Sequence, residues 1–544
     1  MAMKDMFRWM KWKNHKLTVV FFLATTFCLL LLLLVHFTPD GIAKPYGDCP
    51  RTSSSSPREE NSFISTETKQ PQPQSQQPQQ GETVVKVVEE WQFPSVQDDR
   101  PHEELTDLES FEQPRRYMPM GSSAFLYIQF GAYRIGPNAF AVVGLAPKFL
   151  HKEGNPGFDC SWVSSGGDNN STTVKGWTSK HKPDWGLGMQ YSVVVVHCTF
   201  SGEVGADGSG GRLEFVATHG TSDHTGLPDA HWVALKEDPN EYDGSVFVAP
   251  YKYDYLYCGS PIFGSISPQR IREWIAYHVW RFGPRSHFVL YDAGGIHEGV
   301  RKILQPWVEK GFVSVFNIRQ QSRYEQYYYS QFLVVNDCLL KGKTLANWTF
   351  FFDVDEYIYV PEPFTFDQVM MEYANMGRRA QQVHFKQNFM SHFHCRNESL
   401  DAGVLQRRWM IEKLVYRRTQ HTKRWGFPNR KYAIQAQYAS STGVHNSMDT
   451  SHPQGMGHKE TVIVEDFKLS YNHYHHTVDR HDEICKEFVN PTLTTMELFG
   501  PTGLDGPPTP PQLALHVLDT GMAALADAVR EFENRTVGEQ PFLL

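Results

Sequence analysis

Apolar and polar positions divide the chain into stretches of different character. Residues 17–37 form a nearly unbroken apolar run, and five Lys or Arg residues precede it between Lys4 and Lys16. About 20 apolar residues suffice to span a bilayer, whereas a cleaved signal peptide would have a shorter apolar core. Within residues 38–115, the run Ser53–Ser56 and the Gln- and Pro-rich tract 70–78 have almost nothing to bury. The pattern predicts a cytosolic tail (1–16), a transmembrane anchor (17–37) and a solvated stem (38–115) that leads into a lumen.

Between residues 116 and 249, short β-rich runs alternate with Gly, Asn, Asp and Pro turns. Regular spacing of this kind is typical of an antiparallel β-sandwich. Trp162, Trp177 and Trp185 lie in turn-rich segments. Their faces suit sugar rings, although Trp residues are more often buried in a core. We therefore expect a β-sandwich over 116–249 that is either a plain structural domain or a carbohydrate-binding module.

From residue 250 the pattern changes to alternating strands and helices. Strand-like runs end near residues 258, 291, 316 and 352, and helix-like stripes separate them, the first between Ser267-Pro268 and Gly283 and the third over about 323–340. Such a series predicts a parallel sheet covered by helices, here a catalytic domain over 250–500. Apolar positions from Leu513 to Val529 predict a helix in a C-terminal extension (501–544), where it docks on that domain or contacts a second copy in a homodimer.

Three carboxylates, Asp353, Asp355 and Glu356, follow the fourth strand-like run. Side chains two positions apart along a strand point to the same side, and ligands of parallel sheets bind at the carboxyl ends of strands. Carboxylates that meet at one point repel each other unless a cation lies between them. The sequence therefore favours a divalent metal site at Asp353 and Asp355 over a solvated turn. A third ligand must come from elsewhere, and the histidine pair in 473–475 follows another strand-like run.

Composition adds information about the compartment and about partners. The 544-residue chain carries a formal net charge of −8 at pH 7, which argues against a general nucleic-acid-binding surface. Five glycosylation sequons and seven cysteines beyond residue 37 agree with an oxidising lumen. Cys160 and Cys198 form the expected intradomain disulfide.

Several spaced motifs carry a family resemblance. They are Tyr257-Cys258-Gly259-Ser260-Pro261, Trp274-Ile275-Ala276-Tyr277-His278, Asn336-Asp337-Cys338, Phe352-Asp353-Val354-Asp355-Glu356-Tyr357, Gly443-Val444-His445-Asn446 and His473-Tyr474-His475. This array resembles the family 92 glycosyltransferases and, within them, the plant β-1,4-galactan synthases. The resemblance implies an α/β catalytic domain of the GT-A type, dependence on Mn²⁺ and UDP-galactose as donor. It also implies an inverting transfer that extends the β-1,4-galactan side chains of pectin, on rhamnogalacturonan I, by a single-pass type II protein of the Golgi membrane.

Matched by position, the resemblance assigns Asp353, Asp355 and His473 to the metal. It places UDP-galactose against residues of two of these motifs and against Asp292, and the full set is Cys258, Gly259, Ser260, Asp292, Asn336 and Asp337. The general base that an inverting displacement needs stays open, because arginine stands in the region 403–408 where animal members carry a glutamate. The candidates are Glu412, His445 and Asp449, with Glu465 and Asp466 beside them.

Two other classes of function remain compatible with the residues. A glycoside hydrolase would use Asp353 with Asp355 or Glu356 as its carboxylate pair, without a nucleotide or a metal. A non-catalytic wall-glycan-binding protein would rely on the β-sandwich and its aromatic side chains. Chelation of metals separates the hydrolase from the transferase, and absence of turnover separates the binding protein from both.

Overall fold

The computed structural model describes residues 111–121, 125–148, 155–165, 171–184, 190–219, 228–324, 327–376, 380–397, 407–419, 423–424, 427–428, 430–447, 461–463, 468–490, 492–500 and 512–541. By its contacts the chain divides into Met1–Ser95 and Val96–Leu544, and the described residues all belong to the second unit. The predicted tail, the predicted anchor and nearly all of the predicted stem lie outside them. Among the described residues, no helix is both long enough and apolar enough to cross a bilayer.

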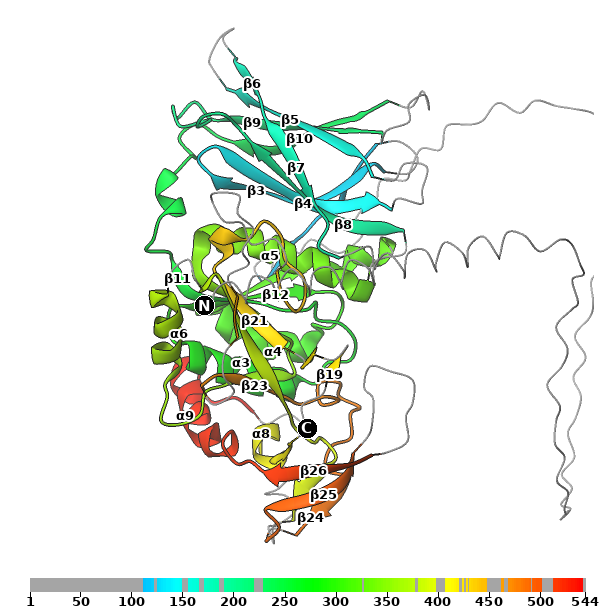
Figure 1. Cartoon of the computed structure of the whole chain (residues 1–544), viewed down its shortest axis with the longest axis vertical. Coiled ribbons are helices and arrows are strands. Elements are labelled where there is room, and N and C mark those ends of the chain that lie inside the picture. The colour runs from blue at the N-terminus through cyan, green and yellow to red at the C-terminus, as the bar shows by residue number, and fades with distance from the viewer. Residues whose placement is uncertain are drawn as a thin grey trace, which may run out of the picture. The chain divides into compact units, whose positions relative to one another are not determined.

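A ten-stranded mixed sheet forms the centre of this unit. Its strands run in the order β1-β13-β12-β11-β14-β21-β16-β23-β15, and β22 pairs with β16 outside this path. Figure 1 labels β11, β12, β21 and β23 of this sheet. The strands are β1 (Glu112–Pro114), β11 (Tyr253–Cys258), β12 (Ser286–Asp292), β13 (Val313–Asn317), β14 (Ala346–Phe351), β15 (Glu356–Tyr359), β16 (Gln382–Phe389), β21 (Arg430–Ile434), β22 (Thr461–Ile463) and β23 (Ser470–His473).

The expectation of a parallel sheet is confirmed for one half of this sheet. Strands β1, β13, β12, β11 and β14 are parallel. Beyond β14 the sheet is mixed, because β21 runs antiparallel to both β14 and β16, and β15 runs antiparallel to β23. The strand order reverses between β11 and β14, which is the position at which open α/β sheets bind ligands.

Helices cover both faces of the central sheet. They are α3 (Pro268–Phe282), α4 (Glu298–Glu309), α5 (Gln331–Leu345) and α6 (Phe366–Asn375). Side chains of α3, α4 and α6 share one apolar core with the sheet, and those of α5 share another. As predicted, α3 has a proline at its start and ends at Gly283, whose φ of 78° suits a glycine. The third predicted helix begins later than expected, because the 3₁₀ turns η2 (Arg319–Arg323) and η3 (Tyr327–Ser330) occupy its first part.

Two antiparallel sheets precede the central sheet in the chain. One has the order β2-β3-β4-β8-β7 and the other β10-β9-β5-β6. Their strands are β2 (Met118–Met120), β3 (Tyr127–Gly136), β4 (Ala139–Pro147), β5 (Gly157–Ser164), β6 (Thr173–Lys175), β7 (Trp177–His181), β8 (Tyr191–Thr199), β9 (Gly211–Thr218) and β10 (Ala230–Glu237). Apolar side chains of both sheets form one core, and a disulfide between Cys160 and Cys198 joins β5 to β8, as predicted.

The tryptophans of these two sheets have different surroundings. Trp162 is buried in the shared core, whereas Trp177 is 63% exposed, and Trp185 lies outside the described residues. Helix α5 connects these sheets with the central one, because it contacts β3 and β4 as well as β11 and β14. A short 3₁₀ turn, η1 (Gly244–Phe247), leads from β10 to β11.

The predicted helix over 513–529 is wrong for its first part. Residues Gln512–Leu518 form strand β26, which pairs with β25 (Thr495–Gly500) and β18 (Tyr416–Arg418). The apolar residues at 513, 515 and 517 recur at every second position, which is the period of a strand. A helix follows later, as η6 (Ala523–Leu525) and α9 (Ala526–Val537), and Glu533 of α9 accepts hydrogen bonds from Arg272 of α3. The remaining elements are β17 (His394–Arg396), α8 (Met410–Lys413), β19 (Lys423–Arg424), β20 (Phe427–Pro428), η5 (Ala436–Tyr438) and β24 (Glu487–Val489).

Candidate functional site

A pocket of about 520 Å³ opens at the carboxyl ends of β11 and β14. Its volume lies within the range of about 300–1,000 Å³ that is usual for small-ligand sites. The wall comes from the loop after β11, the turn between β14 and β15, the start of α5, β21 and the segment from the end of β23 onward. Elements far apart in sequence therefore meet where the strand order reverses.

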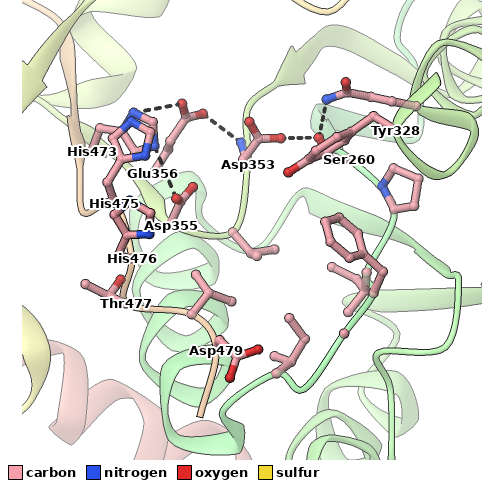
Figure 2. Close-up of a pocket in the computed structure, with 18 of the residues that line it drawn as sticks. Ser260, Tyr328, Asp353, Asp355, Glu356, His473, His475, His476, Thr477 and Asp479 are labelled. Atoms are coloured by element: carbon pink, nitrogen blue, oxygen red, sulfur yellow. Dashed lines mark hydrogen bonds and ion pairs between the residues drawn. The ribbon is translucent and has the colours of Figure 1, made fainter. Parts of the chain in front are cut away.

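Asp353 and Asp355 lie in the turn between β14 and β15 rather than on the strand itself, because β14 ends at Phe351. Both carboxylate oxygens of Asp353 have partners. Oδ1 accepts a hydrogen bond from the Ser260 hydroxyl, and Oδ2 lies 2.6 Å from Nζ of Lys431. The amide of Gln331, at the start of α5, donates to the Ser260 hydroxyl in turn. Figure 2 shows Ser260 and Asp353 side by side.

Glu356 lies beneath this turn and is 1% exposed. Its Oε2 accepts the backbone N–H of Asp353 at 2.7 Å and lies 3.3 Å from Nζ of Lys431. Lys431, on β21, is itself buried. One ammonium group therefore contacts two carboxylates in the floor of the pocket.

Pairing between β15 and β23 brings the late histidines to the same place. Glu356 stands opposite His473 in this register. His473 Nε2 lies 3.2 Å from Asp355 Oδ2, and its Nδ1 lies 2.7 Å from the Gln387 amide and 3.6 Å from Glu356 Oε1. The His475 ring lies against the His473 ring, with centroids 3.5 Å apart and the planes tilted by 31°. Figure 2 shows both rings beside Asp355.

Two overlapping groups of side chains could hold a metal ion. One ligand atom from each of Asp355, His473 and His475 lies within 4.8 Å of the others, and the same is true of Asp353, Asp355 and Glu356. A mixed set of carboxylate and imidazole ligands fits a divalent ion such as Mn²⁺. The carboxylate of Glu356 near Nδ1 of His473 is the kind of acceptor that orients a metal-bound imidazole. The residues present therefore fit the metal that the sequence predicts.

The electrostatics of the carboxylates point the same way. Burial raises the pKa of Asp355, and repulsion from Asp353 adds to the increase although His475 opposes it. Burial also raises the pKa of Glu356, against the opposing charge of Lys431. Although burial alone would raise it, the pKa of Asp353 is lowered to about 2, because Lys431 and the Ser260 hydroxyl stabilise its charge. Negative charge is thus stabilised unevenly, and a cation near Asp355 would relieve the remaining repulsion.

Among the predicted donor-binding residues, the structure brings Ser260 to the pocket wall. The neighbouring Gly259 packs closely against Tyr257, because a Cβ at this position would lie 1.8 Å from the Tyr257 hydroxyl. The side chain of Cys258 is buried in a disulfide with Cys338, so Cys258 offers no free thiol to the donor. Asp292 is buried as well, where it accepts N–H groups of its own loop and pairs with Arg319.

The side chains of Asn336 and Asp337 are buried in α5, and neither is among the described residues that line the pocket, so their donor contacts stay a prediction. Asn336 exchanges hydrogen bonds with the backbone of Thr442. Asp337 pairs with Arg115 and Lys341 and accepts the hydroxyls of Tyr133 and Tyr291. These contacts join α5 to the preceding sheets and the 442 loop, so both residues have structural roles.

The three base candidates differ in position. His445 lies on the pocket wall, and its Nδ1 is 3.1 Å from the Arg430 carbonyl. Glu412 is not among the described residues that line the pocket; it caps α8 and pairs with Arg530. Asp449, like Glu465 and Asp466, lies outside the described residues.

Sequence reasoning did not single out Lys431 or the aromatic side of the pocket. Strand register places Lys431 beside Asp353, and nothing in the local sequence around Lys431 indicates that register. Tyr328 lines the pocket, while Tyr329 stacks on Phe263 with centroids 3.9 Å apart. Tyr328, Tyr329 and Ser330 have φ values of 46°, 54° and 68°. Consecutive left-handed residues other than glycine are strained, and such strain gathers at functional sites.

Comparison with known proteins agrees with this picture. A sequence model of glycosyltransferase family 92 matches residues 253–504. The chain is 41% identical over 425 residues to the Arabidopsis thaliana protein named "Galactan beta-1,4-galactosyltransferase GALS1", an alignment that covers 78% of this chain and 79% of the relative. It is 40% identical over 432 residues to each of the Arabidopsis thaliana proteins named "Galactan beta-1,4-galactosyltransferase GALS3" and "Galactan beta-1,4-galactosyltransferase GALS2", covering 78% of this chain and 79% and 77% of those relatives.

Proposed function

The chain belongs to glycosyltransferase family 92, and from this premise we propose that it is an inverting galactosyltransferase. Its donor is UDP-galactose, and its acceptor is the non-reducing end of the β-1,4-galactan chains of rhamnogalacturonan I. The single observation that carries the proposal is the carboxylate–histidine cluster of Asp355, His473 and His475 in a pocket where the strand order reverses. The names of the relatives supply the sugar and the acceptor.

In the proposed reaction, the diphosphate of the donor lies over the turn that carries Asp353 and Asp355. Asp355, His473 and His475 would hold a divalent cation such as Mn²⁺, which would supply Lewis-acid stabilisation of the charge on the departing diphosphate. Asp355 and His473 would present their ligand atoms to the metal, and Glu356 would orient the imidazole as the acceptor near Nδ1. Tyr328 offers its ring to the donor from the aromatic side of the pocket.

For the proton of the acceptor hydroxyl we propose His445 among the three base candidates. A hydrogen bond donated by Nδ1 to the Arg430 carbonyl would leave the lone pair on Nε2, which is the form that accepts a proton. Glu412 is less suited because its carboxylate pairs with Arg530.

A hydrolase with Asp353 as its general acid is disfavoured by the same geometry. Such an acid must carry a proton at working pH, so its pKa must be raised. The pKa of Asp353 is instead lowered to about 2: burial acts in the opposite direction, but Lys431 and Ser260 outweigh it. This carboxylate therefore remains charged. Because burial raises the pKa of Asp355 and of Glu356, a hydrolase that used either of them as the acid is separated from the transferase by chelation.

The proposal extends to the organisation of the whole chain. The catalytic part takes the GT-A fold, and the preceding sheets form a β-sandwich that binds carbohydrate. The apolar run at 17–37 anchors the protein in the Golgi membrane as a single-pass type II protein with its catalytic part in the lumen. The parallel strands followed by the antiparallel β21 and the exposed Trp177 support the first two statements.

The direct test measures chain lengthening of short β-1,4-galactan by the full-length chain with a panel of UDP-sugars and Mn²⁺. We expect transfer from UDP-galactose, loss of transfer on chelation, and loss in Asp355→Asn with the urea unfolding midpoint retained. Asp482→Asn is the matched control, because Asp482 lines the same pocket outside both candidate metal groups. Full activity of Asp355→Asn, or transfer that survives chelation, would refute the proposed mechanism.

A further inference from the structure

Lys431 is a buried cation in the floor of the pocket. Its side chain is 4% exposed, and its Nζ lies 2.6 Å from Asp353 Oδ2 and 3.3 Å from Glu356 Oε2. It comes from β21, which pairs with β14 so that Tyr432 stands opposite Phe351. The side chain of Lys431 therefore reaches the turn that directly follows β14.

A charged ammonium group is costly to bury unless carboxylates compensate it. Here the ammonium group of Lys431 has two carboxylate partners, Asp353 and Glu356. The third carboxylate of the cluster, Asp355, has different contacts. The oxygens of Asp353 are engaged by Lys431 and by the Ser260 hydroxyl, and Glu356 holds the backbone N–H of Asp353. Asp355 instead faces the imidazole of His473.

The formal charges of the cluster are consistent with different roles for its carboxylates, some pairing with Lys431 and one binding a cation. When all three are ionised, Asp353, Asp355 and Glu356 carry three negative charges and Lys431 carries one positive charge, which leaves two negative charges. A divalent cation balances that remainder. Repulsion from Nζ of Lys431 would also keep such a cation away from the Asp353 side of the cluster.

We propose that Lys431 is a positioning residue of this site: a permanent counter-ion that holds Asp353 and Glu356 and directs the divalent cation to Asp355, His473 and His475. Asp353 then acts through its contacts with Lys431 and Ser260 and is not a direct ligand. The inference rests on the proposed function only in taking a divalent cation as the ligand, and it requires neither UDP-galactose nor galactan.

The test titrates Mn²⁺ into the purified full-length chain without donor and follows free Mn²⁺ by electron paramagnetic resonance. In Lys431→Met the removal of a nearby positive charge tightens Mn²⁺ binding by about tenfold, while kcat for transfer falls because the Asp353 turn loses its support. Lys431→Arg retains the charge and has an Mn²⁺ affinity within about twofold of the original. Unchanged or weaker Mn²⁺ binding by folded Lys431→Met would overturn the proposal.

Lys343→Met is the matched control, because Lys343 is also buried but donates to the carbonyls of Ala436 and Ala439 rather than to carboxylates. Its Mn²⁺ affinity should not change. If Lys431→Met does not fold, the double variant Asp353→Asn/Lys431→Met removes both members of the ion pair and keeps the net charge.

We expect this double variant to bind Mn²⁺ about as tightly as the unaltered chain, and a loss of binding would show that Asp353 is a direct ligand. If the unaltered chain does not transfer galactose, but the variants show the Mn²⁺ affinities expected above, the proposed function is refuted and the role of Lys431 stands.

Discussion

The substitution Asp337→Asn distinguishes a structural role from donor binding. Asp337 is fully buried in α5, where Arg115 and Lys341 pair with its carboxylate and Tyr133 and Tyr291 donate to it. Since Arg115 follows β1 and Tyr133 belongs to β3, the carboxylate joins the N-terminal sheets to the helix that supports the pocket. We expect loss of stability without a selective effect on the donor.

The size of the loss follows from the carboxylate's environment. Burial alone would raise it, yet the pKa of Asp337 is lowered to about 2 because Arg115 and Lys341 stabilise the charge. Relative to an ordinary aspartate with a pKa of about 3.9, this shift corresponds to about 2.5 kcal/mol at neutral pH. Removing the charge also leaves two partly buried cations, Arg115 and Lys341, without their carboxylate, and breaking a fully buried pair in this way costs about 3–5 kcal/mol.

Urea denaturation followed by tryptophan fluorescence measures the effect. At pH 7 the unfolding midpoint of Asp337→Asn should be clearly lower than that of the unaltered chain. Because the folded pKa is depressed, the stabilisation is present above about pH 4 and is lost as the pH falls toward 2. The gap between the two proteins should therefore narrow toward acid pH.

Asp238→Asn serves as the control, since Asp238 forms an exposed pair with Lys236 that contributes little. A stable Asp337→Asn variant whose KM for the donor alone is raised would refute this reasoning and restore a donor contact for Asp337.

Three further perturbations test other parts of the structure. Gly259→Ala would bring a Cβ to 1.8 Å from the Tyr257 hydroxyl, so we expect a loss of at least 1–3 kcal/mol in the free energy of unfolding; an unchanged urea midpoint would contradict this contact. Burial lowers the pKa of His278 to about 3. The unfolded chain therefore binds more protons below its pKa of about 6.5, and stability should fall by about 2 kcal/mol between pH 7.5 and 5, a loss that His278→Gln should reduce. Glu412→Gln should lower the melting temperature while leaving kcat within about twofold, because Glu412 pairs with Arg530 and does not line the pocket; a loss of transfer by a folded variant would return it to the list of bases.

Local pattern was enough to predict the parallel half of the central sheet. Strands β11, β12, β13 and β14 and the helices between them each carry their own signal, and chain connectivity makes them parallel. The same logic put Asp353 and Asp355 at the carboxyl end of β14. The Cys160–Cys198 disulfide was also predicted, and the structure has it.

Where two periods compete, sequence reasoning failed. The stretch Gln512–Leu518 reads as a helix if the apolar positions up to Val529 are taken together, but alternates as a strand when taken alone. Pairing with β18 and β25 selects the strand. The buried roles of Asn336 and Asp337 were missed because a helix pattern does not show which polar residue receives partners from another sheet.

By itself, the sequence determined that carboxylates follow an apolar strand in an α/β region and that a histidine pair follows a later one. Only the tertiary structure decided what surrounds them. Register between β15 and β23 sets His473 opposite Glu356 and so within reach of Asp355, and β21 brings Lys431 to Asp353 from 78 residues away. The physical reason is that strand pairing is set by backbone hydrogen bonds and burial across the whole sheet, so the partner of a charged side chain is chosen by contacts that local spacing does not encode.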